Sequence, residues 1–308
     1  MNNRIPKAAF FDIDGTLVPY DTRCISQADC EAIEALSKQG TLIFIVTGRH
    51  ICDIDNIPFP VDGAVCCNGA LTYITEDGRA CFNEKERFVL ADEHPIPERQ
   101  AMEIARIIAE NQIPSAASTA TGTLFSYQTK ETLEFIRRIN MPLPKEGNIF
   151  EAALNGCVYS FNAFVSPEKE KILFKDVLCG LDTSRWCEEF CDINIQGLDK
   201  VLGIKKILDT YNIAPADIIA FGDGINDIEM LKYAGCGIAM GTATDEVKSA
   251  ADFVTASAND CGASKWLSSF MILNNSNKRD HEPDAIISDF VSCLPEYCKF
   301  ASPLKHTL

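Results

Sequence analysis

Short runs of consecutive apolar residues recur along this chain, and polar or charged residues follow each run at once. The clearest runs are residues 8–11, 42–46 and 218–221. Unbroken apolar runs of this length are typical of strands buried on both faces, as in parallel sheets. Between the first two runs, residues 26–39 place apolar side chains at helical spacing, and Gly40 marks the end of that helix. The pattern predicts an α/β core, in which helices cover both faces of a parallel sheet.

A different pattern fills the middle of the chain. Residues 123–127, 159–165 and 191–195 alternate apolar with polar side chains, as half-buried antiparallel strands do. Helical spacing lies between them, at residues 96–111, 130–139 and 167–178. This stretch is far longer than a strand crossover requires. We therefore predict an inserted α+β domain.

The change of pattern divides the chain into three parts. They are a core of residues 1–81 and 193–273, an insert of residues 82–192 and a C-terminal extension of residues 274–308. Polar residues open the extension, and residues 286–294 then show helical spacing. That spacing predicts a helix, which either docks on the core or binds a partner.

Two carboxylates stand directly after the first apolar run, at Asp12 and Asp14. In extended backbone, side chains two residues apart point the same way, so both can face one site. Gly15 then permits a sharp turn. Asp-Gly between apolar residues is also the signature of a tight hairpin, and this stretch alone leaves both interpretations open. A calcium-binding loop is excluded, because Leu17 and Arg23 stand where that loop needs Gly and Glu.

Polar residues follow other predicted strands in the same way. Residues 47–49 follow the second apolar run, residues 222–227 follow the third, and Lys200 opens a helical pattern after a strand-like segment. Open α/β sheets bind ligands at the carboxyl ends of their strands. We therefore expect these separate stretches to assemble one site.

Taken together and in this order, the stretches resemble the motifs of the haloacid dehalogenase (HAD) superfamily, in its Cof-like sugar-phosphate phosphatase branch. The motifs are Asp12-Ile-Asp14-Gly-Thr16, Thr47-Gly-Arg49, Lys200 and Gly222-Asp-Gly-Ile-Asn226-Asp227, with Asn68-Gly69-Ala70 and Ala239-Met240-Gly241 as further stretches common in that branch. The resemblance covers roughly residues 8–270. One departure is Val201, where the branch usually has Gly. The resemblance implies a Rossmann-like core and makes the insert a type-two (C2) cap.

The resemblance also assigns catalytic roles. Asp12 is the implied nucleophile, which forms an aspartyl-phosphate, and a carboxylate needs no base to activate it. Asp14 then protonates the leaving alkoxide and later deprotonates the attacking water. That role requires a raised pKa, which neighbouring carboxylates favour. Lys200 offsets the charge of the transition state.

Four further residues are implied to bind the phosphoryl group of the substrate. They are Thr47, Gly48 (through its amide), Arg49 and Asn226. For Arg49 two interpretations stay open, because its side chain reaches either the substrate or an acid in the cap.

The implied cofactor is Mg²⁺, held by Asp12, Asp14 (through its carbonyl), Asp223 and Asp227. Several acids beside a phosphate dianion need a counter-charge, and Mg²⁺ prefers oxygen ligands. For Asp227 a second interpretation is an aspartate in the first turn of a helix, stabilised by the helix dipole.

Composition narrows the class of protein. The formal net charge of −16 argues against nucleic acid and anionic membranes as partners. The first predicted strand begins too early to leave room for a signal peptide, so we expect a cytoplasmic protein, monomeric or weakly oligomeric. The 14 cysteines are interpreted as small buried apolar residues, because the chain has only four histidines and no Cys-x-x-Cys pair.

The sequence thus predicts a Mg²⁺-dependent phosphatase that acts on a small soluble phosphate ester, such as a sugar phosphate. A phosphotransferase or mutase acting on sugar phosphates is an alternative that uses the same residues. A phospho-ligand sensor without turnover is a third, although such sensors often lack the nucleophile or the acid that Asp12 and Asp14 supply here.

Overall fold

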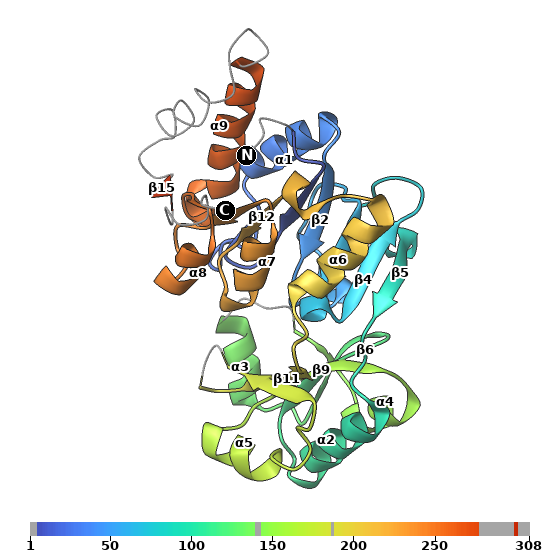
Figure 1. The fold of residues 1–308 in the computed structure, drawn as a ribbon. Coiled ribbons are helices and arrows are strands. Elements are labelled where there is room, and N and C mark those ends of the chain that lie inside the picture. The colour runs from blue at the N-terminus through green and yellow to red at the C-terminus, as the bar shows by residue number, and fades with distance from the viewer. Residues whose placement is uncertain (1–4, 139–142, 186–187, 277–298, 301–308) are drawn as a thin grey trace.

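The computed structural model describes residues 5–138, 143–185, 188–276 and 299–300, whose strands form two sheets (Figure 1). The larger sheet has nine strands in the order β15-β14-β13-β12-β1-β2-β3-β4-β5. Their bounds are β1 Ala8–Phe11, β2 Leu42–Val46, β3 Gly63–Cys66, β4 Leu71–Thr75, β5 Phe88–Glu93, β12 Ile218–Gly222, β13 Cys236–Ala239, β14 Phe253–Val254 and β15 Lys299–Phe300.

The middle of the larger sheet is parallel. Strand β1 pairs in parallel with β12 on one side and β2 on the other, so Phe10 lies between Ala220 and Phe44. Among the described strands of this sheet, the antiparallel pairs are β3 with β4, β4 with β5, and β14 with β15. The carboxyl ends of β1, β2 and β12 therefore lie next to one another at one edge of the sheet.

Helices cover both faces of the larger sheet. On one face, α1 (Gln27–Lys38) and α9 (Gly262–Ser276) pack against β1 and β12, where the Trp266 ring meets the edge of Phe221. On the other face, α6 (Lys200–Tyr211) and α7 (Ile228–Tyr233) pack with Phe10 and Phe44. The short α8 (Asp245–Ala250) lies beside α7. The predicted α/β core with helices on both faces is confirmed.

The smaller sheet has six strands in the order β10-β11-β9-β6-β7-β8. Their bounds are β6 Ser115–Thr119, β7 Gly122–Ser126, β8 Lys145–Glu146, β9 Val158–Ala163, β10 Leu181–Ser184 and β11 Cys191–Ile195. Its strands are antiparallel except for the pair β7 and β8. This is the half-buried alternating pattern that the sequence predicted.

The two faces of the smaller sheet differ. Helices α2 (Glu98–Glu110) and α4 (Ile149–Asn155) pack on one face, and α5 (Pro167–Leu173) lies on the same side in Figure 1. Helix α3 (Lys130–Arg138) packs on the opposite face through Phe135 and Ile136. That opposite face also meets the larger sheet's domain, because Thr123 of β7 donates a hydrogen bond to Asp53.

The domain boundaries stay predictions, but the strand pairing adjusts them. Strand β5 pairs with β4 in the larger sheet, although it lies within the predicted insert of residues 82–192. Strand β11 belongs to the smaller sheet and ends at Ile195. We therefore propose that the insert comprises residues 94–195, which keeps each sheet within one domain.

The C-terminal extension is described only in part. The predicted helix at residues 286–294 lies outside the described residues. Helix α9 runs to Ser276, and residues 299–300 form β15, which pairs antiparallel with β14. Among the helices that the structure describes, none combines the length and the apolar character that crossing a membrane requires.

Candidate active site

The first loop of the site follows β1 directly. Asp12 is buried there, and its amide donates to the carbonyl of Phe221 in the neighbouring β12. Gly15 has a φ of +83°, and a Cβ at this position would lie 2.1 Å from Oδ2 of Asp223. Glycine is thus required both by the turn and by the close approach of the carboxylate. The hairpin interpretation of this stretch is wrong, because β1 and β2 are parallel.

Lys200 is held between two carboxylates. Its Nζ lies 2.6 Å from Oδ1 of Asp12 and 2.6 Å from Oδ1 of Asp227, and its side chain is 1% exposed. Burial alone would lower the pKa of Lys200, but the two carboxylates outweigh burial and raise it. Burial raises the pKa of Asp12, and the Lys200 ammonium opposes that shift. Lys200 is therefore a buried positive charge between two buried carboxylates.

The position of Lys200 is set by the loop before it. The side chain of Asp199 accepts from the amide of Leu202 at 3.1 Å and so begins α6 at Lys200. Gly69 brings another loop against this turn, because a Cβ there would lie 2.1 Å from the Asp199 carbonyl oxygen. Val201 in place of the usual Gly leaves the start of the helix intact.

Asp227 organises the loop that follows β12. Its Oδ2 accepts from the amides of Asp223 at 3.0 Å and Gly224 at 2.8 Å, while its Oδ1 faces Lys200. The carboxylate is buried, and both of its oxygens accept hydrogen bonds. Asp227 therefore does more than interact with a helix dipole, because it closes this loop and orients the lysine.

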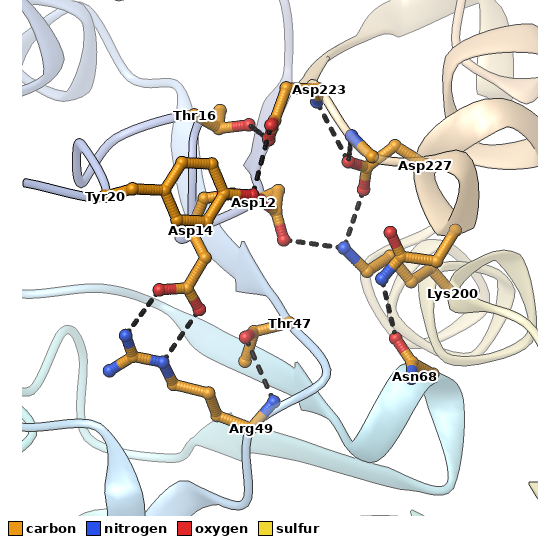
Figure 2. A network of polar contacts seen from close by, with 12 residues as sticks. Asp12, Asp14, Thr16, Tyr20, Thr47, Arg49, Asn68, Lys200, Asp223 and Asp227 are labelled. Atoms are coloured by element: carbon orange, nitrogen blue, oxygen red, sulfur yellow. Dashed lines mark hydrogen bonds and ion pairs between the residues drawn. The ribbon is translucent and has the colours of Figure 1, made fainter. Parts of the chain in front are cut away.

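Asp223 presents its carboxylate to two hydroxyl groups. Thr16 Oγ1 donates to Oδ1 at 2.9 Å, and Tyr20 OH donates to Oδ2 at 3.4 Å. The Tyr20 hydroxyl also lies 3.2 Å from the Asp14 carbonyl oxygen (Figure 2). Burial, together with the charge of Asp227, raises the pKa of Asp223 to about 6.

Three of the carboxylates form a group that fits a cation. Asp12, Asp223 and Asp227 each offer one oxygen, and these oxygens lie within 4.8 Å of one another. Lys200 supplies one positive charge against the three carboxylates. Burial is the largest cause of the raised pKa values of Asp12 and Asp223, and the charge of Asp227 adds to both shifts. An all-oxygen donor set with excess negative charge is what Mg²⁺ binds.

Arg49 pairs with Asp14 rather than with an acid of the smaller sheet. Its Nε lies 2.8 Å from Oδ2 of Asp14, and its Nη2 lies 2.5 Å from Oδ1, which makes a bidentate pair. Arg49 is buried, whereas the Asp14 side chain is 31% exposed. The Arg49 amide also donates to Thr47 Oγ1 at 3.1 Å, so the threonine hydroxyl keeps its own proton for another acceptor.

The loop after β3 completes the site. Cys67, Asn68 and Gly69 have consecutive positive φ angles of 51°, 53° and 104°, a tight left-handed turn. It brings the Asn68 side chain against Gly48, where a Cβ would lie 3.3 Å from the amide group. Oδ1 of Asn68 accepts from Nδ2 of Asn226 at 3.0 Å. Two loops far apart in sequence are thereby joined.

The structure brings the predicted site residues to one edge of the larger sheet (Figure 2). They are Asp12, Asp14, Thr47, Gly48, Arg49, Lys200, Asp223, Asn226 and Asp227. Their catalytic and ligand-binding roles remain predictions. The contacts of Asn68 and Thr16 were not predicted, although both stand in the motifs quoted above. Tyr20 was missed because an aromatic residue in a polar turn gives no signal of where its hydroxyl points.

Comparisons with known proteins agree with this geometry. A family model described as haloacid dehalogenase-like hydrolase matches residues 9–267. The putative phosphatase YkrA of Bacillus subtilis is 29% identical over 259 residues, which cover 83% of this chain and 94% of YkrA. The pyridoxal phosphate phosphatase YbhA of Escherichia coli is 26% identical, over 79% of this chain and 90% of YbhA.

A solved structure gives the same result. The HAD subclass IIB sugar phosphatase BT4131 is 30% identical and superposes with a TM-score of 0.72, covering 86% of this chain and 99% of BT4131. Family match, fold and site agree, and the chain belongs to the haloacid dehalogenase-like hydrolases, in their Cof-like phosphatase branch.

Proposed function

We propose that this protein is a Mg²⁺-dependent phosphatase that hydrolyses a small phosphate ester, such as a sugar phosphate, through an aspartyl-phosphate on Asp12. One observation carries the proposal: Lys200 Nζ lies 2.6 Å from both Asp12 and Asp227 in a buried site beside Asp223. A buried ammonium among carboxylates at the carboxyl edge of a parallel sheet suits phosphoryl transfer, where positioning and charge do most of the work.

In the first step, an oxygen of Asp12 attacks the phosphorus atom and the bond to the ester oxygen breaks. The Thr47 hydroxyl and the Gly48 amide hold phosphoryl oxygens, and Lys200 offsets the charge that spreads over them. The Thr47 hydroxyl is suited to this role because its oxygen accepts from the Arg49 amide, which leaves its proton to donate to a phosphoryl oxygen.

Asp14 handles the protons of both steps. It protonates the leaving ester oxygen, and it later takes a proton from the water that attacks the phosphorus atom. The bond between phosphorus and Asp12 then breaks, and inorganic phosphate leaves. Both oxygens of Asp14 are hydrogen-bonded to Arg49, so this pair must open before Asp14 can reach a leaving oxygen.

The donor atoms of Asp12, Asp223 and Asp227, with the Asp14 carbonyl, would hold Mg²⁺. When bound, Mg²⁺ supplies positive charge against the carboxylates and the phosphoryl group. The relatives that support a small substrate act on different esters, since one is a sugar phosphatase and another a pyridoxal phosphate phosphatase. The proposal therefore names a class of ester.

The test is a panel of sugar phosphates, nucleoside monophosphates and pyridoxal phosphate, with released phosphate as the readout. We expect turnover with Mg²⁺, its loss on chelation and its return when Mg²⁺ is restored. Asp12→Asn should be inactive, whereas the matched control Asp21→Asn, in the exposed loop after β1, should retain activity. Full activity after exhaustive chelation, or in Asp12→Asn, would contradict the proposal.

A further inference from the structure

The ligand atoms proposed for the cation already have neighbours in this structure. Nζ of Lys200 donates to Oδ1 of Asp12, and Oγ1 of Thr16 donates to Oδ1 of Asp223. Two of the remaining oxygens, Oδ2 of Asp223 and the Asp14 carbonyl, face the Tyr20 hydroxyl at 3.4 and 3.2 Å. Tyr20 thus contacts two candidate ligand oxygens that accept no hydrogen bond from Lys200 or Thr16 (Figure 2).

We propose that the Tyr20 hydroxyl is a displaceable hydrogen-bond donor in the cation site, which competes with Mg²⁺ for the Asp14 carbonyl and the Asp223 carboxylate. The inference rests on the proposed Mg²⁺ site and adds a residue that tunes it. In the free protein the hydroxyl partly compensates the charge of Asp223. When the cation coordinates these oxygens, the hydroxyl gives up its bonds to them.

The geometry makes Tyr20 easy to displace. A phenol has a single proton, so its two acceptors share one donor. Both distances are longer than the 2.7–2.8 Å typical of O–H···O hydrogen bonds, so each contact is weak. Mg²⁺ by contrast coordinates oxygen ligands directly, at about 2.0–2.1 Å. Exchange of the donor for the cation is therefore favourable.

The surroundings of Tyr20 allow its ring to move. The residue is 63% exposed, and residues 20–24 are all exposed. The ring approaches the site over Gly15, where a Cβ would lie 2.7 Å from its Cε2 atom. Outward movement of the ring therefore opens no part of the apolar core. The missing side chain at Gly15 explains how a ring in a surface turn reaches the partly buried Asp223 carboxylate.

Thr16 offers a matched contrast at the same carboxylate. Its hydroxyl donates to Oδ1 of Asp223 at 2.9 Å, is fully buried and leaves Oδ2 free. Thr16 therefore holds the carboxylate in place without occupying the oxygen that faces Tyr20. Removal of the two hydroxyls should change the affinity for Mg²⁺ in opposite directions.

The experiment is calorimetric titration of the whole protein with Mg²⁺. We expect Tyr20→Phe to bind Mg²⁺ about three- to fivefold more tightly than the wild type, because one weak competing hydrogen bond is removed. Thr16→Val should bind more weakly. Tyr127→Phe, a partly exposed tyrosine of the smaller sheet's domain, is the control and should match the wild type.

A second measurement follows the ring itself. In protein labelled with 3-fluorotyrosine, the fluorine resonance that disappears in Tyr20→Phe should shift when Mg²⁺ is added, while the Tyr127 resonance stays in place. If the wild type binds Mg²⁺ but Tyr20→Phe binds equally or more weakly, or the Tyr20 resonance does not move, the competition is refuted and the proposed function stands. If the wild type does not bind Mg²⁺ at all, both proposals fail.

Discussion

The two sheets of this molecule carry their polar residues in different places. In the larger sheet, β1 and β2 are apolar throughout, and their polar chemistry begins where each strand ends, at Asp12 and Thr47. In the smaller sheet, polar residues lie on one face. The cross-strand pair Asn162 and Asp192 is an example, on the side opposite the face that packs against α2 and α4.

The difference follows from what covers each sheet. A parallel sheet with helices on both faces has no exposed face, so functional side chains are confined to the strand ends. In the smaller, antiparallel sheet, α2 and α4 pack on one face and α3 packs on part of the other, so polar residues remain on that second face whether or not it has a function. Polar residues next to a strand of the larger sheet therefore indicate a functional site, whereas polar residues in the smaller sheet do not by themselves indicate one.

If the chemistry is confined to the strand ends, removal of the nucleophile should have the largest effect. Asp12→Asn keeps the shape of the side chain and should lower turnover by a factor on the order of 10⁶, the scale seen when a hydrolase loses its nucleophile. Alkyl and aryl phosphate esters should fail alike. Steady-state rates on both esters are the measurement. Residual activity within tenfold of the wild type would show that Asp12 is not the nucleophile.

Lys200→Ala should have the next largest effect. We expect turnover to fall about 10²- to 10³-fold, as when one donor to a developing oxyanion is removed. The variant should also be less stable, because Lys200 is the buried partner of two carboxylates and its loss leaves them without their counter-charge.

The measurement therefore pairs kinetics with thermal unfolding. The variant should lose activity and also unfold at a lower temperature, whereas Lys205→Ala, one turn and a residue further along α6, serves as the control. If the Lys200→Ala variant keeps its activity, Lys200 has no catalytic role. A variant that loses activity without loss of stability would show that the buried pairs contribute little to folding.

Asp14→Asn should have an effect that depends on the substrate. An alkoxide is a poor leaving group, so esters of alcohols should lose the first step. The phenolate of an aryl ester is a stable leaving group, so aryl esters should retain the first step. The attack of water on the aspartyl-phosphate should then be slow. Rapid-mixing kinetics with an aryl ester should show a burst of released phenol followed by slow turnover. Equal loss on both ester types, with no phosphoenzyme trapped, would mean that Asp12 and Asp14 do not divide the roles in this way.

The same contrast explains how much could be predicted from the sequence. The parallel core and the convergence of its loops were predictable, because apolar runs and the residues that follow them are local signals. Strand β6 (Ser115–Thr119) was missed, because its small side chains show no alternation and its pairing with β7 and β9 is set by tertiary contacts. The Arg49–Asp14 pair was also missed, because side-chain direction depends on packing that sequence spacing does not contain.

The smallest expected effect concerns the polar face of the smaller sheet. Asp192 accepts a hydrogen bond from Asn162, and burial raises the pKa of its carboxyl from 3.8 to about 6, while Asn162 and Arg185 act in the opposite direction. Because the folded state binds this proton more tightly than the unfolded state, the carboxyl contributes stability at low pH. That contribution is lost as pH rises from 3.8 through about 6.

Asp192→Asn removes this titration and keeps an oxygen that can accept from Asn162. The free energy of unfolding of the wild type, relative to the variant, should fall by on the order of 1–3 kcal/mol between about pH 4 and about pH 7. Denaturant titrations at both pH values measure it, with Asp182→Asn as the control because Asp182 is exposed on the neighbouring β10. Parallel pH profiles for the wild type and Asp192→Asn would mean that Asp192 is solvated. The polar face of the smaller sheet would then differ from the strand ends of the larger one in burial as well as in position.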